Sequence, residues 1–276
     1  MNHSLLIGIA LIIASSCEKE NAIKKVDDVC TQMEDSNFMK YCYDNFDVNN
    51  DGMVSMQEAA AVKQISCSRK GITSLKGIEY FTTITSLDCS GNYDLTLLDV
   101  SKNTQLTVLL CDDCSLTSLD VSKNTQLTEL ICRSNSLTSL NVSKNIHLTN
   151  LNCQANSSLT SLNVSKNIHL TSLNCYNLVE LTSLDVSKNT QLTELSCGNC
   201  SLTSLDVSKN TQLTSLACHS NNLTSLDVSK NTQLTRLYCF HNDLTSLDVS
   251  KNTLLNICEY NPQKDGRNIP ITGWKK

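Results

Sequence analysis

The stretch LTELICRSNSLTSLNVSKNIH, from Leu127 to His147, returns almost unchanged as LTSLACHSNNLTSLDVSKNTQ, from Leu213 to Gln233. The cysteine of the LxxLxC motif marks each copy, and successive copies lie 21 or 22 residues apart. Nine cysteines hold this position: Cys67, Cys89, Cys111, Cys132, Cys153, Cys175, Cys197, Cys218 and Cys239. A fixed period of this length indicates one small unit that cannot bury its apolar face alone and must stack on its neighbours. The sequence therefore predicts a repeat solenoid.

Each unit has two halves that differ in apolar spacing. In the first half, apolar residues such as Leu130 and Cys132 alternate with outward ones, which predicts a short β-strand with one buried face. The Asn that follows, such as Asn135, is predicted to stack its amide on the neighbouring units and to bond the turn backbone. The second half contributes Leu205, Val207 and their equivalents to the opposite wall. The predicted fold class is an α/β-type repeat solenoid.

The LxxLxCxxNxL core, repeated from residue 62 to 261, resembles the leucine-rich repeat. The motif LDVSKNTxLTxLxC resembles that of a group of bacterial surface lipoproteins, and the period and the helical capping are similar to those of the internalins. This resemblance implies short parallel strands on a concave face that binds protein ligands. The ends of such an array need caps, which we assign to residues 17–61 and to the tail, residues 262–276.

The segment FDVNNDGMVSMQE, from Phe46 to Glu58, has the spacing of an EF-hand calcium loop. Its expected ligands are the side chains of Asp47, Asn49, Asp51, Ser55 and Glu58 and the backbone carbonyl of Met53. The oxygen-bearing side chains alternate so that they converge on one ion, and Gly52 permits the sharp turn. The sequence thus predicts a structural Ca2+ site. The alternative is an acidic turn that holds no metal.

The calcium loop has no second loop to pair with. EF-hand loops usually pair through their eighth residue, which is Val54 in this sequence. Phe38 and Cys42 fit an amphipathic helix before the loop, begun by Asp35 or Ser36, and a second helix is expected after it. We expect Val54 to pack against the edge of the repeat array, so that the loop and its helices form an EF-hand-like cap.

The N-terminus carries an apolar run of ten residues, Leu5 to Ala14, which is too short to cross a bilayer as a helix. Ser15, Ser16 and Cys17 follow, and the pattern resembles a bacterial lipoprotein signal. The resemblance implies a signal peptide over residues 1–16, lipid attachment at Cys17 and membrane contact through that anchor alone. The protein would then lie in the cell envelope, anchored at the outer membrane or cell surface. Ordinary secretion and a cytosolic apolar N-terminus are the alternatives.

Fifteen cysteines are too many for an ordinary cytosolic protein, and the repeat accounts for most of them. Two CxxC motifs begin at Cys111 and Cys197, but they lie four repeats apart, about 19 Å at roughly 4.8 Å per strand, so they cannot share a zinc ion. Cys114 and Cys200 are interpreted as replacements for ladder asparagines, and the repeat cysteines as buried thiols that act as small hydrophobes. Cys30 and Cys42 form the pair that best fits a disulfide.

Charge gives no sign of a nucleic-acid partner, because the net charge is -5 and basic residues are not clustered. A column of lysines, from Lys102 to Lys251, recurs two residues after each inward Val. A column of aspartates, from Asp99 to Asp248, lies three residues before the lysines. Because opposite charges run side by side, we expect a solvated, mutually paired surface and not an anion-binding one.

The outward strand positions vary between repeats, whereas the second half of the unit hardly changes. Specificity for a ligand is therefore expected on the strand face. The last repeats concentrate the residue types that anchor interfaces, which predicts a ligand-contact patch of Tyr176, His219, Arg236, Tyr238 and Phe240. The alternative is that these are incidental surface residues near a cap.

These observations favour an exported calcium-binding leucine-rich-repeat protein that binds a protein ligand or mediates adhesion at a bacterial surface. No nucleophile elbow, phosphate loop or zinc-protease motif is present, so no catalytic residue and no enzymatic activity is expected. A glycan-binding module is the first alternative, favoured by the Asn-rich repeats between Asn150 and Asn174. An architectural spacer without a ligand is the second, favoured by the scarcity of aromatic residues: 1 Trp, 7 Tyr and 4 Phe.

Overall fold

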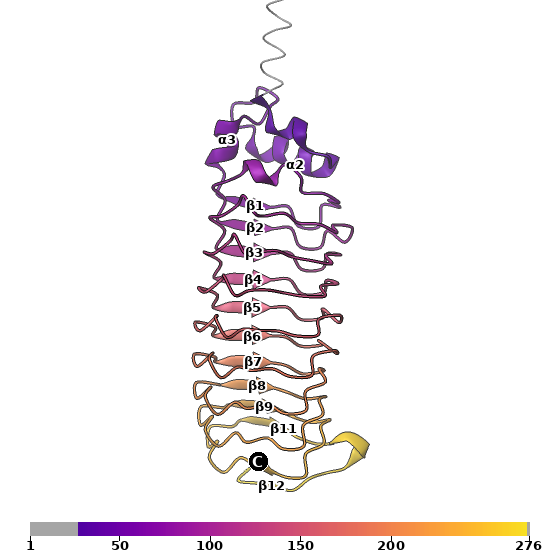
Figure 1. The fold of residues 1–276 in the computed structure, drawn as a ribbon, viewed down its shortest axis with the longest axis vertical. Helices are drawn as coiled ribbons and strands as arrows, with labels where there is room; N and C mark the ends of the chain where they lie inside the picture. Colours follow the sequence, from indigo (N-terminus) through magenta and orange to yellow (C-terminus); the bar gives the residue numbers. More distant parts are fainter. Residues whose placement is uncertain (1–26, 275–276) are drawn as a thin grey trace, which may run out of the picture.

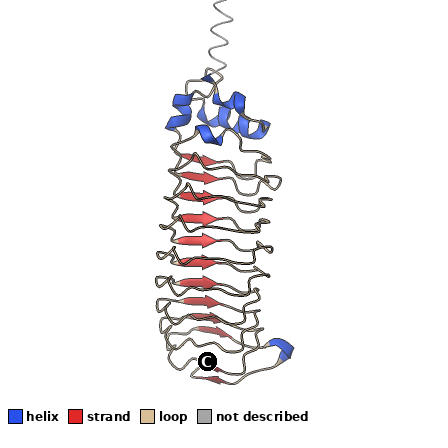
Figure 2. Cartoon of the chain, in the orientation of Figure 1, coloured by secondary structure: helices blue, strands red, loops and turns tan. Residues whose placement is uncertain are grey.

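The computed structural model describes residues 27–274 and shows an elongated stack with helices at its N-terminal end (Figure 1). A 3₁₀ helix, Val29–Gln32, and two α-helices, α2 (Ser36–Phe46) and α3 (Met56–Ala61), form this cap. Further 3₁₀ helices span Ile78–Tyr80 and Lys264–Gly266. Figure 2 shows the strands following one another along the stack below the helical cap. In the described part of the chain, no helix has the length and apolarity needed to cross a bilayer.

Ten short strands form one parallel sheet in which β1 to β9 pair in chain order and β11 pairs with β9. They are β1 (Gln64–Ser66), β2 (Ser86–Asp88), β3 (Val108–Leu110), β4 (Glu129–Ile131), β5 (Asn150–Asn152), β6 (Ser172–Asn174), β7 (Glu194–Ser196), β8 (Ser215–Ala217), β9 (Arg236–Tyr238) and β11 (Ile257–Glu259). The register places equivalent positions side by side, so that Leu130 lies between Leu109 and Leu151. The prediction of a stacked parallel-strand solenoid is confirmed. Each turn is called a rung and is named by its ladder cysteine: it begins with a strand, passes through that cysteine and returns along the opposite wall.

The inward positions of the rungs form one continuous core. Leu130, Cys132 and Val142 are fully buried, as are their equivalents along the array. Within β4 the middle residue is buried while its neighbours are half-buried, which is the alternation that the sequence predicts. A fully buried Leu contributes roughly 1.5–3 kcal/mol relative to an exposed one. Because each rung has apolar surface on both sides, its neighbours supply the packing partners.

Two columns of buried asparagines join the rungs. The predicted column follows the ladder cysteine by three residues, and Asn135 Nδ2 donates to the carbonyls of Cys111 at 2.9 Å and Cys132 at 3.0 Å. The sequence reasoning missed a second column on the opposite wall, where the Nδ2 atom of Asn124 donates to two carbonyls at 2.9 Å each. This column comprises Asn103, Asn124, Asn145, Asn167, Asn189, Asn210, Asn231 and Asn252. Its signal in the sequence was the unvarying Asn of the SKN motif.

The length of a rung decides which residue stands in the first column of the next rung. Where five residue steps separate the cysteine from the next buried Leu or Ile, the N–H of that residue needs an acceptor from the following rung, as Leu116 N finds Asn135 Oδ1 at 2.9 Å. The acceptors of this kind are Asn92, Asn135, Asn156, Asn221, Asn242 and Gln263. Three rungs have six steps, and a tight turn within the rung satisfies the N–H of Leu95, Leu159 and Leu181. The rungs that follow these three carry Cys114, Leu178 and Cys200 in place of an amide.

The two ends of the array are closed by different contacts. Asp35 caps α2 by accepting from Phe38 N at 2.8 Å, and it also accepts from the backbone N–H and hydroxyl of Thr73 at 2.8 Å each. At the other end, β12 (Ile271–Thr272) pairs in parallel with β10 (Leu247–Asp248), which belongs to the wall opposite the large sheet. The tail thus covers the last rung.

Candidate binding face and calcium loop

The outward side chains of the large sheet change character along the array. Near the N-terminal end they include Val108, Leu110 and Ile131, which are half-buried and apolar. The middle strands β5 to β8 carry mostly Asn and Ser, and β9 carries Arg236 and Tyr238. The outward positions that vary between repeats therefore lie on one face. The bulky polar and aromatic residues among them lie toward its C-terminal end.

Three of the five predicted contact residues form an aromatic column at the position after the ladder cysteine. His219 and Phe240 stack with ring centroids 4.6 Å apart and an interplanar angle of 5°. Tyr176 lies two rungs from His219, yet the ring centroids are only 5.7 Å apart. The rung between them carries Gly198, where a Cβ would lie 2.9 Å from His219 Nε2. Gly198 therefore makes room for the column, a role that the sequence reasoning missed.

The other two predicted residues adjoin this column on β9. Arg236 forms an ion pair with Glu194 at 3.7 Å, across the intervening strand β8. Tyr238 is half-buried on the same strand. Burial, and then the charge of nearby His241, lowers the pKa of His219, so the stacked imidazole is neutral at pH 7. The five residues are thus neighbours on one face, and their role in binding stays a prediction.

A hollow of about 310 Å³ lies over the middle strands, beside the aromatic column. Its lining includes Asn150, Asn152, Asn174, Ser196 and Glu194. Asn150 Nδ2 donates to Glu129 Oε1 at 2.9 Å, and Asn174 Nδ2 donates to Gln154 Oε1 at 3.0 Å. Small polar side chains, flanked by larger ones at both ends of the face, produce this depression.

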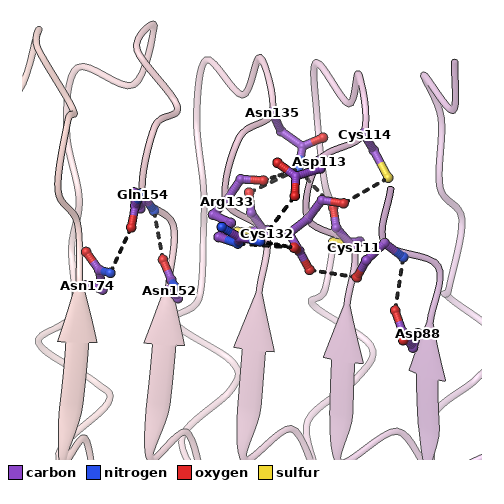
Figure 3. A network of polar contacts seen from close by, with 12 residues as sticks. Asp88, Cys111, Asp113, Cys114, Cys132, Arg133, Asn135, Asn152, Gln154 and Asn174 are labelled. Carbon is purple, nitrogen blue, oxygen red and sulfur yellow. Dashed lines mark hydrogen bonds and ion pairs between the residues drawn. The ribbon is translucent and has the colours of Figure 1, made fainter. Parts of the chain in front are cut away.

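An ion-paired network occupies the N-terminal part of the same face (Figure 3). Arg133 donates to Asp112 Oδ2 from Nε at 3.1 Å and from Nη2 at 2.9 Å, and Nη2 also donates to Asp113 at 3.1 Å. Burial raises the pKa of Asp112, but hydrogen bonds from Ser90 and Arg133 outweigh it and hold the pKa below its usual value. Because these groups already satisfy one another, we place the candidate ligand site in the C-terminal half of the face.

The predicted calcium loop connects α2 to α3, and its acidic side chains accept hydrogen bonds from the loop backbone. Asp51 N donates to Asp47 Oδ1 at 3.1 Å and to Asn49 Oδ1 at 2.9 Å, so these two oxygens lie close together. Gly52, at a φ of 81°, donates its N–H to Asp47 Oδ2 at 2.9 Å. Glu58 Oε1 accepts from Val48 N at 2.9 Å, which brings the twelfth loop residue back to the start of the loop.

This donor set fits a hard cation, because every expected ligand is an oxygen and carboxylates stand at both ends of the loop. Within residues 27–274, however, no three His, Cys, Asp or Glu side chains are already spaced to hold a metal ion. Glu58 is engaged as the capping-box residue of α3, with Ser55 N donating to Oε2 at 2.8 Å. Hydrogen bonds from Ser55 and then Val48 lower the pKa of Glu58, so its carboxylate is ionised at neutral pH. The calcium site stays a prediction.

The backbone of Val54 bonds to residues that precede α2. Val29 N donates to Val54 O at 3.0 Å, and Val54 N donates to Asp28 Oδ1 at 3.1 Å. The Val54 side chain is fully buried in the core that runs from the cap into the repeats. Residues 28 and 29 thus make the backbone contacts that a second EF-hand loop would otherwise provide. They carry no periodic signal, which is why the sequence reasoning overlooked them.

The lysine and aspartate columns are solvated, but the expectation that they pair with each other is wrong. No ion pair between the two columns occurs among residues 27–274. Each Asp carboxylate instead accepts from the Ser N–H two residues later, as Asp206 does from Ser208 at 2.8 Å. This local bond, more than the neighbouring lysine, lowers the pKa of Asp206.

All cysteines among the described residues are free thiols, and all except the half-buried Cys258 are buried. This confirms the interpretation of the rung cysteines as buried thiols. Cys258 pairs in register with Leu237, so it holds an inward Leu position and not a ladder position. Cys30 and Cys42 share a hydrogen bond and are not joined. The predicted signal peptide and Cys17 lie outside the described residues.

Comparison with solved structures identifies the architecture. The functional domain of InlJ from Listeria monocytogenes, described as including a cysteine ladder, is 33% identical to this chain, with a TM-score of 0.60 over 90% of it. This chain has the leucine-rich-repeat fold. Internalin C2 from Listeria monocytogenes is 19% identical with a TM-score of 0.57, and the match covers 83% of this chain and 93% of that one. The leucine-rich-repeat ectodomain of the Arabidopsis thaliana receptor kinase GASSHO1/SCHENGEN3, in complex with CASPARIAN STRIP INTEGRITY FACTOR 2, is 19% identical with a TM-score of 0.60, over 72% of this chain and 27% of that one.

The leucine-rich-repeat chain spans 61% of the length of the InlJ domain. No protein-family model and no curated protein matches its sequence. The internalin-like fold predicted from the repeat period is confirmed by these neighbours. They are internalins and a receptor ectodomain, and the absence of enzymatic activity in this chain stays a prediction.

Proposed function

We propose that this protein is exported to a bacterial cell surface, where its strand face binds a protein ligand and mediates adhesion. The aromatic column of Tyr176, His219 and Phe240, adjoining Arg236 and Tyr238, carries the proposal. Protein interfaces draw most of their binding energy from a few such side chains near their centre. One structural neighbour is a leucine-rich-repeat ectodomain in complex with CASPARIAN STRIP INTEGRITY FACTOR 2, which supports the same proposal.

The test is capture of a partner by residues 17–276, followed by titration of that partner against variants. Replacing Tyr176, His219 and Phe240 together by Ala should weaken binding by about 2 kcal/mol or more, roughly thirtyfold. Replacing Lys188, Lys209 and Lys230 by Ala changes three residues of the opposite wall and should leave affinity unaltered. A loss below about 0.5 kcal/mol for the aromatic triple variant would exclude this patch as the site.

A glycan ligand is the second candidate, favoured by the hollow lined by Asn150, Asn152 and Asn174. Amide and hydroxyl groups around a shallow depression can exchange hydrogen bonds with sugar hydroxyls. The backbone N–H of Tyr176 donates to Asn174 Oδ1, in the lining, at 3.0 Å. An array of neutral and acidic glycans, probed with wild type and with Asn152→Ala, separates this candidate from the protein ligand. If neither the glycan array nor the protein capture detects binding, an architectural spacer is favoured.

We also propose that residues 47–58 bind one structural calcium ion, with affinity of roughly 10⁻⁴ to 10⁻³ M as in extracellular modules. The readout is the change in thermal midpoint between chelator and millimolar calcium. Wild type should gain stability with calcium, whereas Glu58→Gln should gain none. Because Glu58 also caps α3, the calcium-dependent difference decides the test and the absolute midpoint does not. An unchanged midpoint in wild type, together with no calorimetric binding, would refute the site.

Lipid anchoring at Cys17 is the remaining part of the proposal, and it rests on the sequence pattern alone. Expression in a bacterium with lipoprotein processing should place the wild-type protein in the membrane fraction. Cys17→Ser should be found in the soluble fraction instead. An equal distribution of the two proteins would argue for ordinary secretion.

A further inference from the structure

Two first-column positions carry a cysteine that faces the ladder cysteine of the preceding rung. Cys114 Sγ lies 3.5 Å from the carbonyl oxygen of Cys89, and Cys200 Sγ lies 3.3 Å from that of Cys175. This is the contact that Asn135 makes with Cys111 one rung further on. Figure 3 shows Cys114 and Asn135 at equivalent places beyond neighbouring strands.

The thiols of each such pair also meet one another. The thiols of Cys89 and Cys114 are close enough for each to shift the pKa of the other, as are those of Cys175 and Cys200. Successive ladder cysteines are placed differently, because parallel strands in register hold equivalent side chains about 4.8 Å apart. A disulfide needs Cβ atoms about 3.5–4.5 Å apart. The first-column cysteine escapes this restriction, since it follows the strand and turns back toward the previous rung.

Rung length does not explain why these positions are cysteines. Cys114, Leu178 and Cys200 all follow rungs with the additional residue, so none of them has to supply an amide oxygen. Leu178 shows that an aliphatic side chain meets the remaining requirement of burial. Cysteine therefore occupies two of three positions where packing alone would accept Leu.

We propose that Cys89 with Cys114, and Cys175 with Cys200, are two redox-modification sites at which a small disulfide such as oxidised glutathione converts the dithiol into an inter-rung disulfide. The first-column thiolate attacks one sulfur of the oxidant and releases one glutathione thiolate. The ladder thiolate then attacks the mixed disulfide and releases the second. Two protein thiols lose two protons and two electrons, and the oxidant leaves as two glutathione molecules.

The order of attack follows from exposure. Cys114 and Cys200 are each 7% exposed, whereas Cys89 and Cys175 are completely buried. Interaction between the two thiols lowers the pKa of Cys114 and raises that of Cys89, and the same holds for Cys200 and Cys175. The more accessible thiol is thus also the better source of thiolate.

The second site lies directly behind the candidate binding face. Cys175 precedes Tyr176, and Gly198 stands two residues before Cys200. A disulfide between Cys175 and Cys200 would join the two backbone segments that carry Tyr176 and Gly198, and so would fix the base of the aromatic column. This last consequence rests on the proposed function, whereas the disulfides do not.

The test uses the folded chain, purified with reductant and then equilibrated with oxidised glutathione. Remaining thiols are alkylated under denaturant and the peptides are mapped by mass spectrometry. Most molecules should carry linkages of Cys89 to Cys114 and of Cys175 to Cys200, with Cys111, Cys132 and the other ladder cysteines alkylated. Cys114→Ser should abolish only the first linkage, and Cys200→Ser only the second.

Leu178→Cys is the matched gain-of-function variant, because position 178 relates to Cys153 as Cys200 relates to Cys175. It should acquire a third linkage, to Cys153. Circular dichroism before and after oxidation confirms that the chain stays folded. The proposal is overturned if folded protein keeps Cys114 and Cys200 as thiols after prolonged oxidation, or if linkages between successive ladder cysteines form equally well.

Discussion

Buried asparagine has two distinct structural roles in this solenoid. In the first column both ends of the amide are used: Asn156 Oδ1 accepts from Leu137 N at 3.1 Å, and Nδ2 donates to Cys132 O at 3.0 Å. In the second column Nδ2 donates to two carbonyls, while the buried Oδ1 atoms have no hydrogen-bond partner among the described residues. Under-satisfied carbonyl oxygens are better tolerated than orphaned N–H groups. The second column is therefore retained for its donors.

Asn210→Ala tests the second column. It removes the donor for Val186 O at 3.0 Å and for Asn189 O at 2.9 Å, deep in the opposite wall. We expect the free energy of unfolding to fall by about 2–4 kcal/mol, since two buried carbonyls lose their partner. Urea denaturation gives the measurement, and the neighbouring exposed Thr211→Ala should change it by less than about 0.5 kcal/mol. Equal effects of the two variants would contradict the donor role.

Asp35→Asn tests the carboxylate that links the cap to the first rung. Burial raises the pKa of Asp35, but hydrogen bonds from Thr73, Phe38 and Asn37 outweigh it and keep the pKa below 3.8. A pKa depressed by folding adds stability above the unfolded-state pKa, and this stability is lost as pH falls through the folded-state pKa. The variant should lose about 1 kcal/mol at neutral pH, because charged acceptors form the stronger bonds. Its difference from wild type should shrink below about pH 4, and a constant difference across the acid range would count against this account.

At the scale of the element, the hydrogen-bonding needs of one rung determine which residues the neighbouring rung carries. The rung of Cys153 contains one more residue than that of Cys132 between the cysteine and the next buried Leu. The extra residue lets Leu159 N donate to Asn156 O at 3.0 Å, whereas Leu137 N must reach Asn156 Oδ1 in the next rung. Rung length and ladder residue are therefore coupled properties of neighbouring turns.

Deleting Ser158 tests this coupling. The shortened rung would match that of Cys132 and leave Leu159 N facing Leu178, which offers no acceptor. We expect a loss of about 1–3 kcal/mol in the free energy of unfolding. Leu178→Asn should be destabilising in the full-length rung but should recover part of the loss in the deletion variant. A double-mutant cycle measures the coupling, expected to be favourable by about 1 kcal/mol or more; additive effects would disprove it.

The elements that the sequence predicted are those fixed by periodicity. Leu130 and Cys132 alternate, so the strand, its buried face and the ladder of Asn135 could all be derived from the repeat. Non-repeated contacts could not be derived. Gly198 creates the aromatic column through the absence of a side chain, and the pairing of Val54 with Val29 depends on a short segment with no apolar period. The five contact residues were foreseen as a region, but the stacking of three of them was not.

At the scale of the whole molecule, the rungs stack along one axis, so only the first and the last rung have a face that no other rung covers. Strand pairing joins each internal rung to its two neighbours, so stability is close to a sum of rung and interface contributions. The helical cap covers β1, with Phe46 and Phe81 ring centroids 5.4 Å apart at the junction. At the other end, Gln263 acts as the last ladder amide, since its Oε1 accepts from Asn242 N and Leu244 N at 3.2 Å each. The tail thus continues the internal bonding pattern past the last regular rung.

Removing residues 262–276 should therefore destabilise the array from one end and not uniformly. The deletion takes away Gln263 and the pairing of β12 with β10, and it uncovers Leu247 and Val249. Hydrogen exchange should accelerate from β8 to β11 and stay at wild-type rates in β3 to β5, because interface contributions act between neighbours. The uncovered end should also promote association, visible in the mass measured by light scattering. Gln263→Ala in the full chain keeps β12 and should produce a smaller, local acceleration near Asn242 and Leu244. Uniform acceleration along the whole array would show instead that the solenoid unfolds as one cooperative unit.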